Sequence, residues 1–179
     1  SDGTYHYRVS AVNQADTEGA VTAEASATSD RVAPKVVAAL YSTDGVWMPS
    51  EGRFGRGTVT VELALSEGLQ AAPFFSLNPV NGTPISVPLA KVSATGYRGS
   101  FAVTDASPCG AAHATFSGRD AAGNRGTEIQ SGNQITLDVC GPVLSALSVT
   151  PAAPIQNSAA APTTATVVAL FAAGDVPVR

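Results

Sequence analysis

Apolar and polar side chains alternate with a period of two along much of this chain, which is the pattern of half-buried β-strands. The first alternating run, residues 5–11, places Tyr5 and Tyr7 on one face. A turn-rich break at 13–19 separates it from a second alternating run at 21–28. The two runs therefore predict an antiparallel hairpin.

Seven further strand-like runs follow in the next part of the chain. Gly, Pro, Asn or Asp separates each run from the next, and the helical period of 3.6 is absent. Short strands at this spacing predict an all-β fold with two antiparallel sheets packed as a sandwich, and a barrel is the alternative. The predicted strands are 36–40, 58–65, 74–77, 85–92, 99–103, 112–117 and 134–139.

The pattern also repeats along the chain. Asp30-Arg-Val-Ala-Pro34 closes the first hairpin and Asp138-Val-Cys-Gly-Pro142 closes the sandwich, with the same Asp-x-x-x-Pro signal in both. Their separation matches the length of one sandwich domain, which predicts a tandem array. Beyond that second signal, runs at 143–150 and 164–171 indicate the first two strands of another module.

We therefore predict three parts. Residues 1–30 end one module, residues 31–142 form a complete sandwich, and residues 143–179 begin a third module. The modules at both ends are incomplete. Either the chain is a fragment of a longer protein, which we favour, or neighbouring copies complete the open sheets by sharing strands.

Two stretches resemble known families. Residues 2–13 are similar to the sixth strand of a fibronectin type III domain, which implies that Tyr5 is the corner tyrosine whose hydroxyl bonds back to the chain. Residues 31–142 resemble the bacterial immunoglobulin-like repeats of large surface and secreted proteins. This resemblance implies an immunoglobulin-like β-sandwich, a fold that serves many unrelated roles. Its motifs are Leu65-Ser-Glu67, Tyr97-Arg-Gly-Ser-Phe101 and, most specifically, Ala114-Thr-Phe-Ser-Gly-Arg-Asp-Ala-Ala-Gly-Asn124.

Charge and hydropathy narrow the classes of partner. The ten Lys and Arg residues form no run and the net charge is -4, which disfavours nucleic acid and anionic membranes as partners. The longest apolar stretch, residues 165–173, is about half as long as a membrane-spanning helix needs to be. We therefore expect no membrane insertion. Residues 1–4 do not form a signal peptide, so an exported protein would carry its targeting segment upstream.

Two cysteines, Cys109 and Cys140, in an export-like sequence predict a disulfide and an extracellular or cell-surface location. In the assumed topology, a symmetric hairpin with its midpoint at Asn124 and Arg125 would bring the two sulfurs together. Two free thiols are the alternative. A metal site is disfavoured because no Cys-x-x-Cys pair or histidine partner lies nearby.

Asp120, Asn124, Glu128 and Asp138 could offer oxygen ligands to calcium. However, Asp, Gly and Asn at a tight turn are explained by the backbone alone. The spacing also lacks the dense alternating carboxylates of a dedicated calcium loop. We therefore expect a turn here and no cofactor.

We identify no catalytic motif. The sequence contains no Gly-x-Ser-x-Gly, and His6 and His113 each lie within a strand-like run. Residues 52–57 fit neither phosphate-binding template and precede a strand rather than a helix, so they indicate a flexible loop.

Two features could bind a ligand or a glycan. Trp47 and Phe54 could stack on a sugar or on a partner protein, although core packing is the favoured interpretation. Asn81-Gly82-Thr83 matches a glycosylation acceptor, but an Asn-Gly step is also a strong hairpin-turn signal, and the turn interpretation is favoured.

The sequence thus leads us to expect a non-catalytic structural or adhesive segment of an extracellular multi-domain surface protein, acting as a stalk or an interaction array. Expected partners are neighbouring modules, adjacent copies that meet through open sheet edges, and a host or matrix protein or glycan. One alternative is a strand-sharing subunit of a surface filament. Another is a spacer or carbohydrate-binding module attached to a secreted enzyme.

Overall fold

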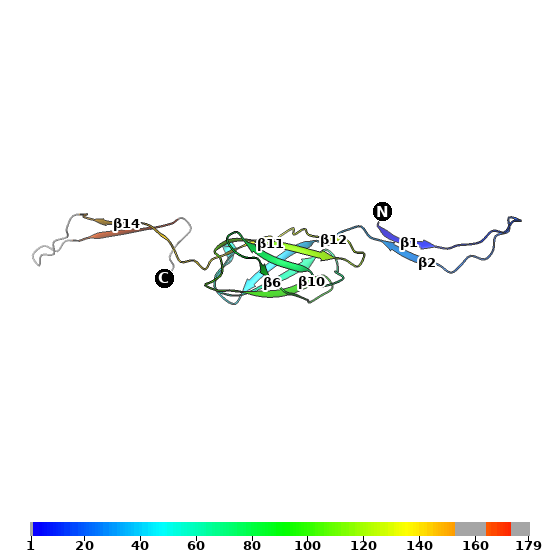
Figure 1. Ribbon diagram of the computed structural model, residues 1–179, viewed down its shortest axis with the longest axis horizontal. Helices are drawn as coiled ribbons and strands as arrows, with labels where there is room; N and C mark the ends of the chain where they lie inside the picture. The colour runs from blue at the N-terminus through cyan, green and yellow to red at the C-terminus, as the bar shows by residue number, and fades with distance from the viewer. Residues whose placement is uncertain (1, 153–163, 173–179) are drawn as a thin grey trace, which may run out of the picture. The chain divides into compact units, whose positions relative to one another are not determined.

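The computed structural model describes residues 2–152 and 164–172, and the remainder of the predicted third module lies outside these residues (Figure 1). The described secondary structure is all β apart from one 3₁₀ turn, Pro49–Glu51. The chain divides into two compact units, residues 1–139 and 140–179. No helix in the described part of the chain is long and apolar enough to cross a membrane.

The first sheet of the larger unit has four antiparallel strands in the order β3-β6-β10-β9. Its centre is β6, which pairs with β3 on one side and with β10 on the other. The strands span Val36–Thr43 (β3), Gly57–Leu65 (β6), Leu89–Lys91 (β9) and Gly96–Val103 (β10).

The second sheet has the order β4-β5-β13-β11-β7-β8, and β12 pairs with β11 off this path. Its pairings are antiparallel except for that between β5 and β13, which is parallel. The strands span Trp47–Met48 (β4), Arg53–Phe54 (β5), Phe74–Pro79 (β7), Ile85–Ser86 (β8), Gly110–Arg119 (β11), Arg125–Gly126 (β12) and Gln134–Leu137 (β13).

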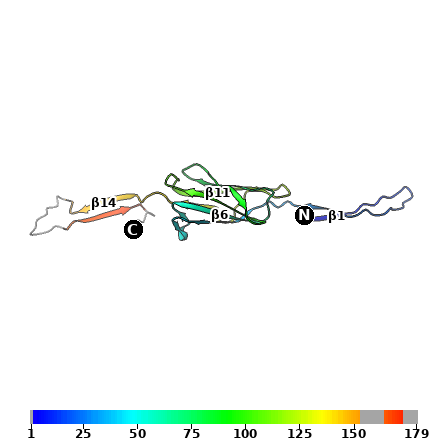
Figure 2. The ribbon, with the colours of Figure 1, turned by 90° about the horizontal axis from the view of Figure 1, so that it is seen from below.

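Figures 1 and 2 show the strands of the central part of the chain, where β6 and β11 belong to different sheets. Alternating side chains from the two sheets meet in one apolar core. On β6, every second residue from Val59 to Leu65 is buried while Thr58 and Ala64 are exposed. On the other sheet, Leu77 and Phe116 are among the least exposed side chains. The residues that alternate in the sequence therefore point alternately into and out of a sandwich-like pair of sheets.

β3 lies at the edge of the first sheet and also bonds to the segment between β12 and β13. Val36 pairs with Leu65 of β6 and also forms a parallel bridge with Ile129, which follows β12. The Val36 N–H donates to the Glu128 carbonyl at 2.9 Å. The register of β3 against β6 shifts between Val36 and Ala38, next to this bridge.

Two expectations about local structure were wrong. Residues 85–92 form two strands instead of one, since β8 pairs with β7 in the second sheet while β9 pairs with β10 in the first. The change of sheet falls at Pro88, which has no N–H to donate to a ladder. Residues 52–57 are not a free loop, because β5 is held by β13 and buries Phe54, which is 3% exposed.

Two hairpins lie outside this core, and their strands are exposed. In the larger unit, β1 (Gly3–Tyr7) pairs with β2 (Ala25–Ser29), as the alternating pattern predicted. In the smaller unit, β14 (Leu144–Thr150) pairs with β15 (Thr166–Phe171). Every described strand residue in these hairpins is exposed except Ser29, which is partly buried.

Replacing a core leucine should cost far more stability than replacing a surface leucine. Leu77 is fully buried, so Leu77→Ala should lower the free energy of unfolding by about 3 kcal/mol through lost burial and a residual cavity. Leu40 is 62% exposed, so Leu40→Ala should change it by less than about 0.5 kcal/mol. Urea unfolding followed by the fluorescence of Trp47 measures both. Equal losses in the two variants would contradict this assignment of the core.

Candidate functional site

A buried carboxylate organises the turn between β11 and β12, residues 120–124. Asp120 is 2% exposed. Its Oδ1 accepts a hydrogen bond from the Asn124 backbone N–H at 2.8 Å, and its Oδ2 accepts one from the Asn124 side-chain amide at 2.8 Å. Gly123 has a φ of 92°, which glycine adopts without strain. Asp, Gly and Asn therefore each have a backbone role in this turn, as the turn interpretation predicted.

The same turn holds the segment that leads into the sandwich. The Asn124 side-chain amide also donates to the Asp30 carbonyl at 3.1 Å, so that one NH₂ group serves both acceptors. A Cβ on Gly126 would lie only 1.5 Å from the Pro34 carbonyl oxygen, so the backbone there leaves room for glycine alone. Residues 30–34 are thus fixed against β12 by a hydrogen bond and by close packing.

Three carboxylates meet beside this turn. One oxygen of each of Asp30, Glu67 and Asp120 lies within 4.8 Å of the other two. Asp30 and Glu67 are partly buried, and Asp120 is buried. Carboxylate oxygens are the ligands that calcium prefers, so in the described part of the chain these are residues that could hold a divalent cation.

The environment pushes the pKa values of two of these carboxyls in opposite directions. Burial and then the negative charges of Asp120 and Asp30 raise the pKa of Glu67. Burial on its own would raise the pKa of Asp120, but hydrogen bonds from Asn124 and from the backbone of Gly123 and Ala122 outweigh it and lower the pKa. As the pH falls, Glu67 is therefore protonated before Asp120.

The calcium candidates predicted from the sequence do not all come together. Asp120 and Asn124 lie in the turn, but Asp138 does not join them. β11 and β13 are antiparallel, so the residue after the end of each strand lies at the opposite end of the sheet. Asp138 instead accepts a hydrogen bond from Arg53 Nη1 at 3.2 Å.

Cys109 and Cys140 are both disulfide-bonded, and they are the two cysteines of the chain, so they form the predicted bond with each other. The expected symmetric hairpin was wrong. Near the cysteines, Gly110 pairs with Leu137, but at the turn Arg119 pairs with Arg125, which centres the turn on Ala122 instead of on Asn124 and Arg125. The register changes because the segment between β12 and β13 leaves β11 to bond with β3.

The aromatic residues considered for ligand stacking pack on one another. The Phe54 ring stacks on Trp47 with a centroid distance of 5.9 Å and meets Tyr41 edge-on at 6.2 Å. Phe54 is buried, whereas Trp47 remains 44% exposed. The Tyr41 hydroxyl donates to the Gly132 carbonyl at 2.9 Å. This arrangement favours the core-packing interpretation for Phe54 and leaves Trp47 as the exposed member of the group.

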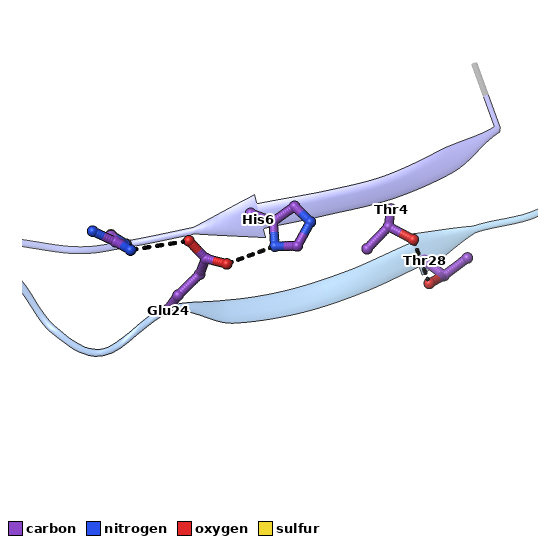
Figure 3. A network of polar contacts seen from close by, with 5 residues as sticks. Thr4, His6, Glu24 and Thr28 are labelled. Carbon is purple, nitrogen blue, oxygen red and sulfur yellow. Dashed lines mark hydrogen bonds and ion pairs between the residues drawn. The ribbon is translucent and has the colours of Figure 1, made fainter.

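One face of the first hairpin carries a row of polar contacts (Figure 3). Glu24 Oε1 lies 2.8 Å from His6 Nδ1, and Glu24 Oε2 lies 3.2 Å from Arg8 Nη2. Further along, the hydroxyls of Thr4 and Thr28 are 3.2 Å apart. The opposite face has Tyr5 and Tyr7 against alanines of β2, so this hairpin has one polar and one largely apolar face. The corner role of Tyr5 stays a prediction.

Sequence reasoning did not identify three residues of this site. Asp30 and Glu67 complete the carboxylate cluster, and Gly126 permits the close approach of Pro34. In the sequence, Asp30 is recognisable only as the start of the Asp-x-x-x-Pro boundary signal, and Glu67 only as part of the motif Leu65-Ser-Glu67. No sequence pattern brings positions so far apart together, because their proximity arises from the packing of the two sheets.

Comparison of the chain with protein-family models, with curated proteins and with solved structures found no match. The site is therefore interpreted from its own geometry. It has three features. Asn124 and Gly126 hold residues 30–34 in place, and we call these contacts the clamp. The other two features are the carboxylate cluster and the disulfide that joins the chain before β11 to the chain after β13.

Asn124→Ala should lower the midpoint of thermal unfolding by several degrees at neutral pH. The change removes the donor shared by the Asp120 carboxylate and the Asp30 carbonyl. Because the folded-state pKa of Asp120 is lowered, this stabilisation is present above pH 3.8 and is lost as the pH falls through the folded-state pKa. Scanning calorimetry across this range measures it. Asn133→Ala, at an exposed position, is the matched control, and an equal effect in both variants would refute the clamp.

Glu67→Gln should raise the thermal midpoint slightly at neutral pH in the presence of a chelator. The raised pKa of Glu67 means that folding disfavours its charge, and this penalty disappears as the pH falls through the folded-state pKa towards 4.5. The gain should therefore vanish in acid. Glu128→Gln, at an exposed carboxylate outside the cluster, provides the comparison. A loss of stability in Glu67→Gln at neutral pH would contradict the predicted repulsion.

Proposed function

We propose that this chain is a non-catalytic structural and adhesive segment of an extracellular multi-domain surface protein. In this proposal, residues 31–142 are an immunoglobulin-like module, while residues 1–30 and 143–179 belong to two further modules. The segment acts as a stalk or interaction array. Its partners are neighbouring modules and a surface protein or glycan outside the chain.

The order of the strands supports an immunoglobulin-like module. The first sheet runs β3-β6-β10-β9, and the second contains β13-β11-β7-β8. In chain order these correspond to strands A, B, E and D facing G, F and C, with one short additional strand beside C. The extra pieces β4 and β5 extend the second sheet beyond its last strand.

The exposed apolar side chains of the two hairpins are the observation that carries the proposal of an array. In the first hairpin, Tyr5 and Tyr7 lie opposite the polar row around Glu24. In the second hairpin, Leu147 and Val149 lie cross-strand from Ala169 and Val167 on one face. Two-stranded ribbons of this kind are marginally stable alone and need a further layer over their apolar face. Each hairpin therefore resembles one edge of another sandwich.

Two further observations agree with an extracellular array. A disulfide persists in oxidising compartments such as the cell exterior. The clamp from Asn124 to Asp30, with Gly126 against Pro34, restrains the short segment between the first hairpin and the central module. A short restrained linker limits bending between modules.

A strand-sharing filament is the second candidate, and the exposed apolar side chains of both hairpins favour it. Val167 is 63% exposed and Leu147 is 60% exposed, although each lies opposite an apolar residue of the partner strand. Strands from another copy could cover such faces. A spacer or carbohydrate-binding module of a secreted enzyme is a further alternative, for which Trp47 is the exposed aromatic candidate.

Antibodies raised against the central module test the proposed location. They should label intact cells that produce the natural protein, because the proposal places residues 31–142 outside the cell. Flow cytometry of intact and permeabilised cells measures the difference. Labelling that requires permeabilisation would overturn the surface proposal.

Sedimentation velocity over a range of concentrations separates the array from the filament. A filament subunit should form a ladder of oligomers that Leu147→Asp and Val167→Asp abolish, because both changes place a charge on the exposed apolar face. Leu40→Asp, at an exposed position of β3 in the first sheet, should leave the ladder of oligomers unchanged. The array proposal predicts no ordered ladder in any of these proteins.

A further inference from the structure

We propose that the Cys109–Cys140 disulfide limits how far the central module can lengthen when the chain is pulled from its two ends. The inference rests on the proposed function, because only a segment that transmits force between modules experiences such a pull. It assigns the disulfide a mechanical role in addition to its effect on stability.

The covalent connectivity makes part of the module inextensible. The bond encloses β11, β12 and β13, which all lie between the two cysteines. Tension applied beyond Cys140 passes through the two sulfurs to Cys109 and then into the preceding chain. The backbone of residues 110–139 therefore bears no tension, even when all of its hydrogen bonds are broken.

The extension that the disulfide prevents is large enough to measure. A fully extended residue spans at most ~3.6 Å, so the roughly thirty enclosed residues would otherwise add about 100 Å. The two bridged Cα atoms stay only about 6 Å apart. Residues 36–109 remain free to extend, and they could supply about 270 Å at the same rise per residue.

The segment enclosed by the disulfide also forms hydrogen bonds with β3, the first strand of the central module. Val36 N–H donates to the Glu128 carbonyl, and Gln130 N–H donates to the Val36 carbonyl, each at 2.9 Å. Ala39 N–H donates to the Ser131 carbonyl at 2.9 Å. A pull on β3 therefore acts on its bonds to a segment that cannot itself be drawn out, as well as on its bonds to β6.

The disulfide further keeps one pairing ready to reform. Gly110 to His113 of β11 pair with Leu137 to Gln134 of β13, immediately beside the bond. With the cysteines joined, these residues stay near one another in the extended chain, so their pairing requires only a short loop to close. A module that has been pulled open therefore keeps a nucleus on which the second sheet can rebuild.

Optical-tweezers measurements on the full 179-residue chain, held by handles at its two ends, test the inference. The oxidised protein is unfolded and kept at constant force, and a small dithiol is then added. The dithiol supplies two electrons and two protons, which convert the disulfide to two thiols. We expect one additional discrete extension of about 100 Å after reduction. No added step, or a step of a few ångströms, would overturn the inference.

The Cys109→Ser/Cys140→Ser double variant is the control, and it should show no dithiol-dependent step. If this variant does not fold, the experiment on the wild-type protein still decides, because it begins from the folded oxidised chain. The outcome is also separate from that of the proposed function. If antibodies do not label intact cells but reduction still adds a step of about 100 Å, the extracellular array is wrong and the mechanical role of the disulfide stands.

Discussion

Burial of alternating side chains between two sheets is the interaction on which the rest of this structure depends. β6 supplies every second residue from Val59 to Leu65, and β7 and β11 supply Leu77 and Phe116 from the facing sheet. Because successive strand residues point to opposite faces, this burial also sets the register of each strand. The turn, the carboxylate cluster and the disulfide all occupy positions that this packing defines.

The polar and covalent ties act where the core ends. At one end of β11, the Asp120 carboxylate and the Asn124 amide secure the turn and hold the chain at Asp30. At the other end of β11, the Cys109–Cys140 bond closes the second sheet and stabilises the fold by about 3 to 4 kcal/mol on the chain-entropy model for a loop of this length. The two contacts thus restrain the chain just before the first strand of the two packed sheets and just after the last one.

The sequence was most informative where one face of a strand is buried. The alternation over residues 58–65 predicted nearly all of β6, because a period of two is the direct imprint of one-sided burial. It failed at residues 85–92, where the strand changes sheets at Pro88, since hydropathy does not record which neighbour a strand bonds. The turn was predictable from its residue types. The approach of Asp30 to Asp120 was not, because only the tertiary fold brings them together.

Native-state hydrogen exchange tests the central claim most directly, namely that the stable core lies between the two sheets and that neither hairpin contributes to it. Amides in the centres of β6 and β11 should exchange only through global unfolding. Amides of β1, β2, β14 and β15 should exchange through local opening at nearly the rate of an unfolded chain. Equal protection in the hairpins and in β6 would contradict the account.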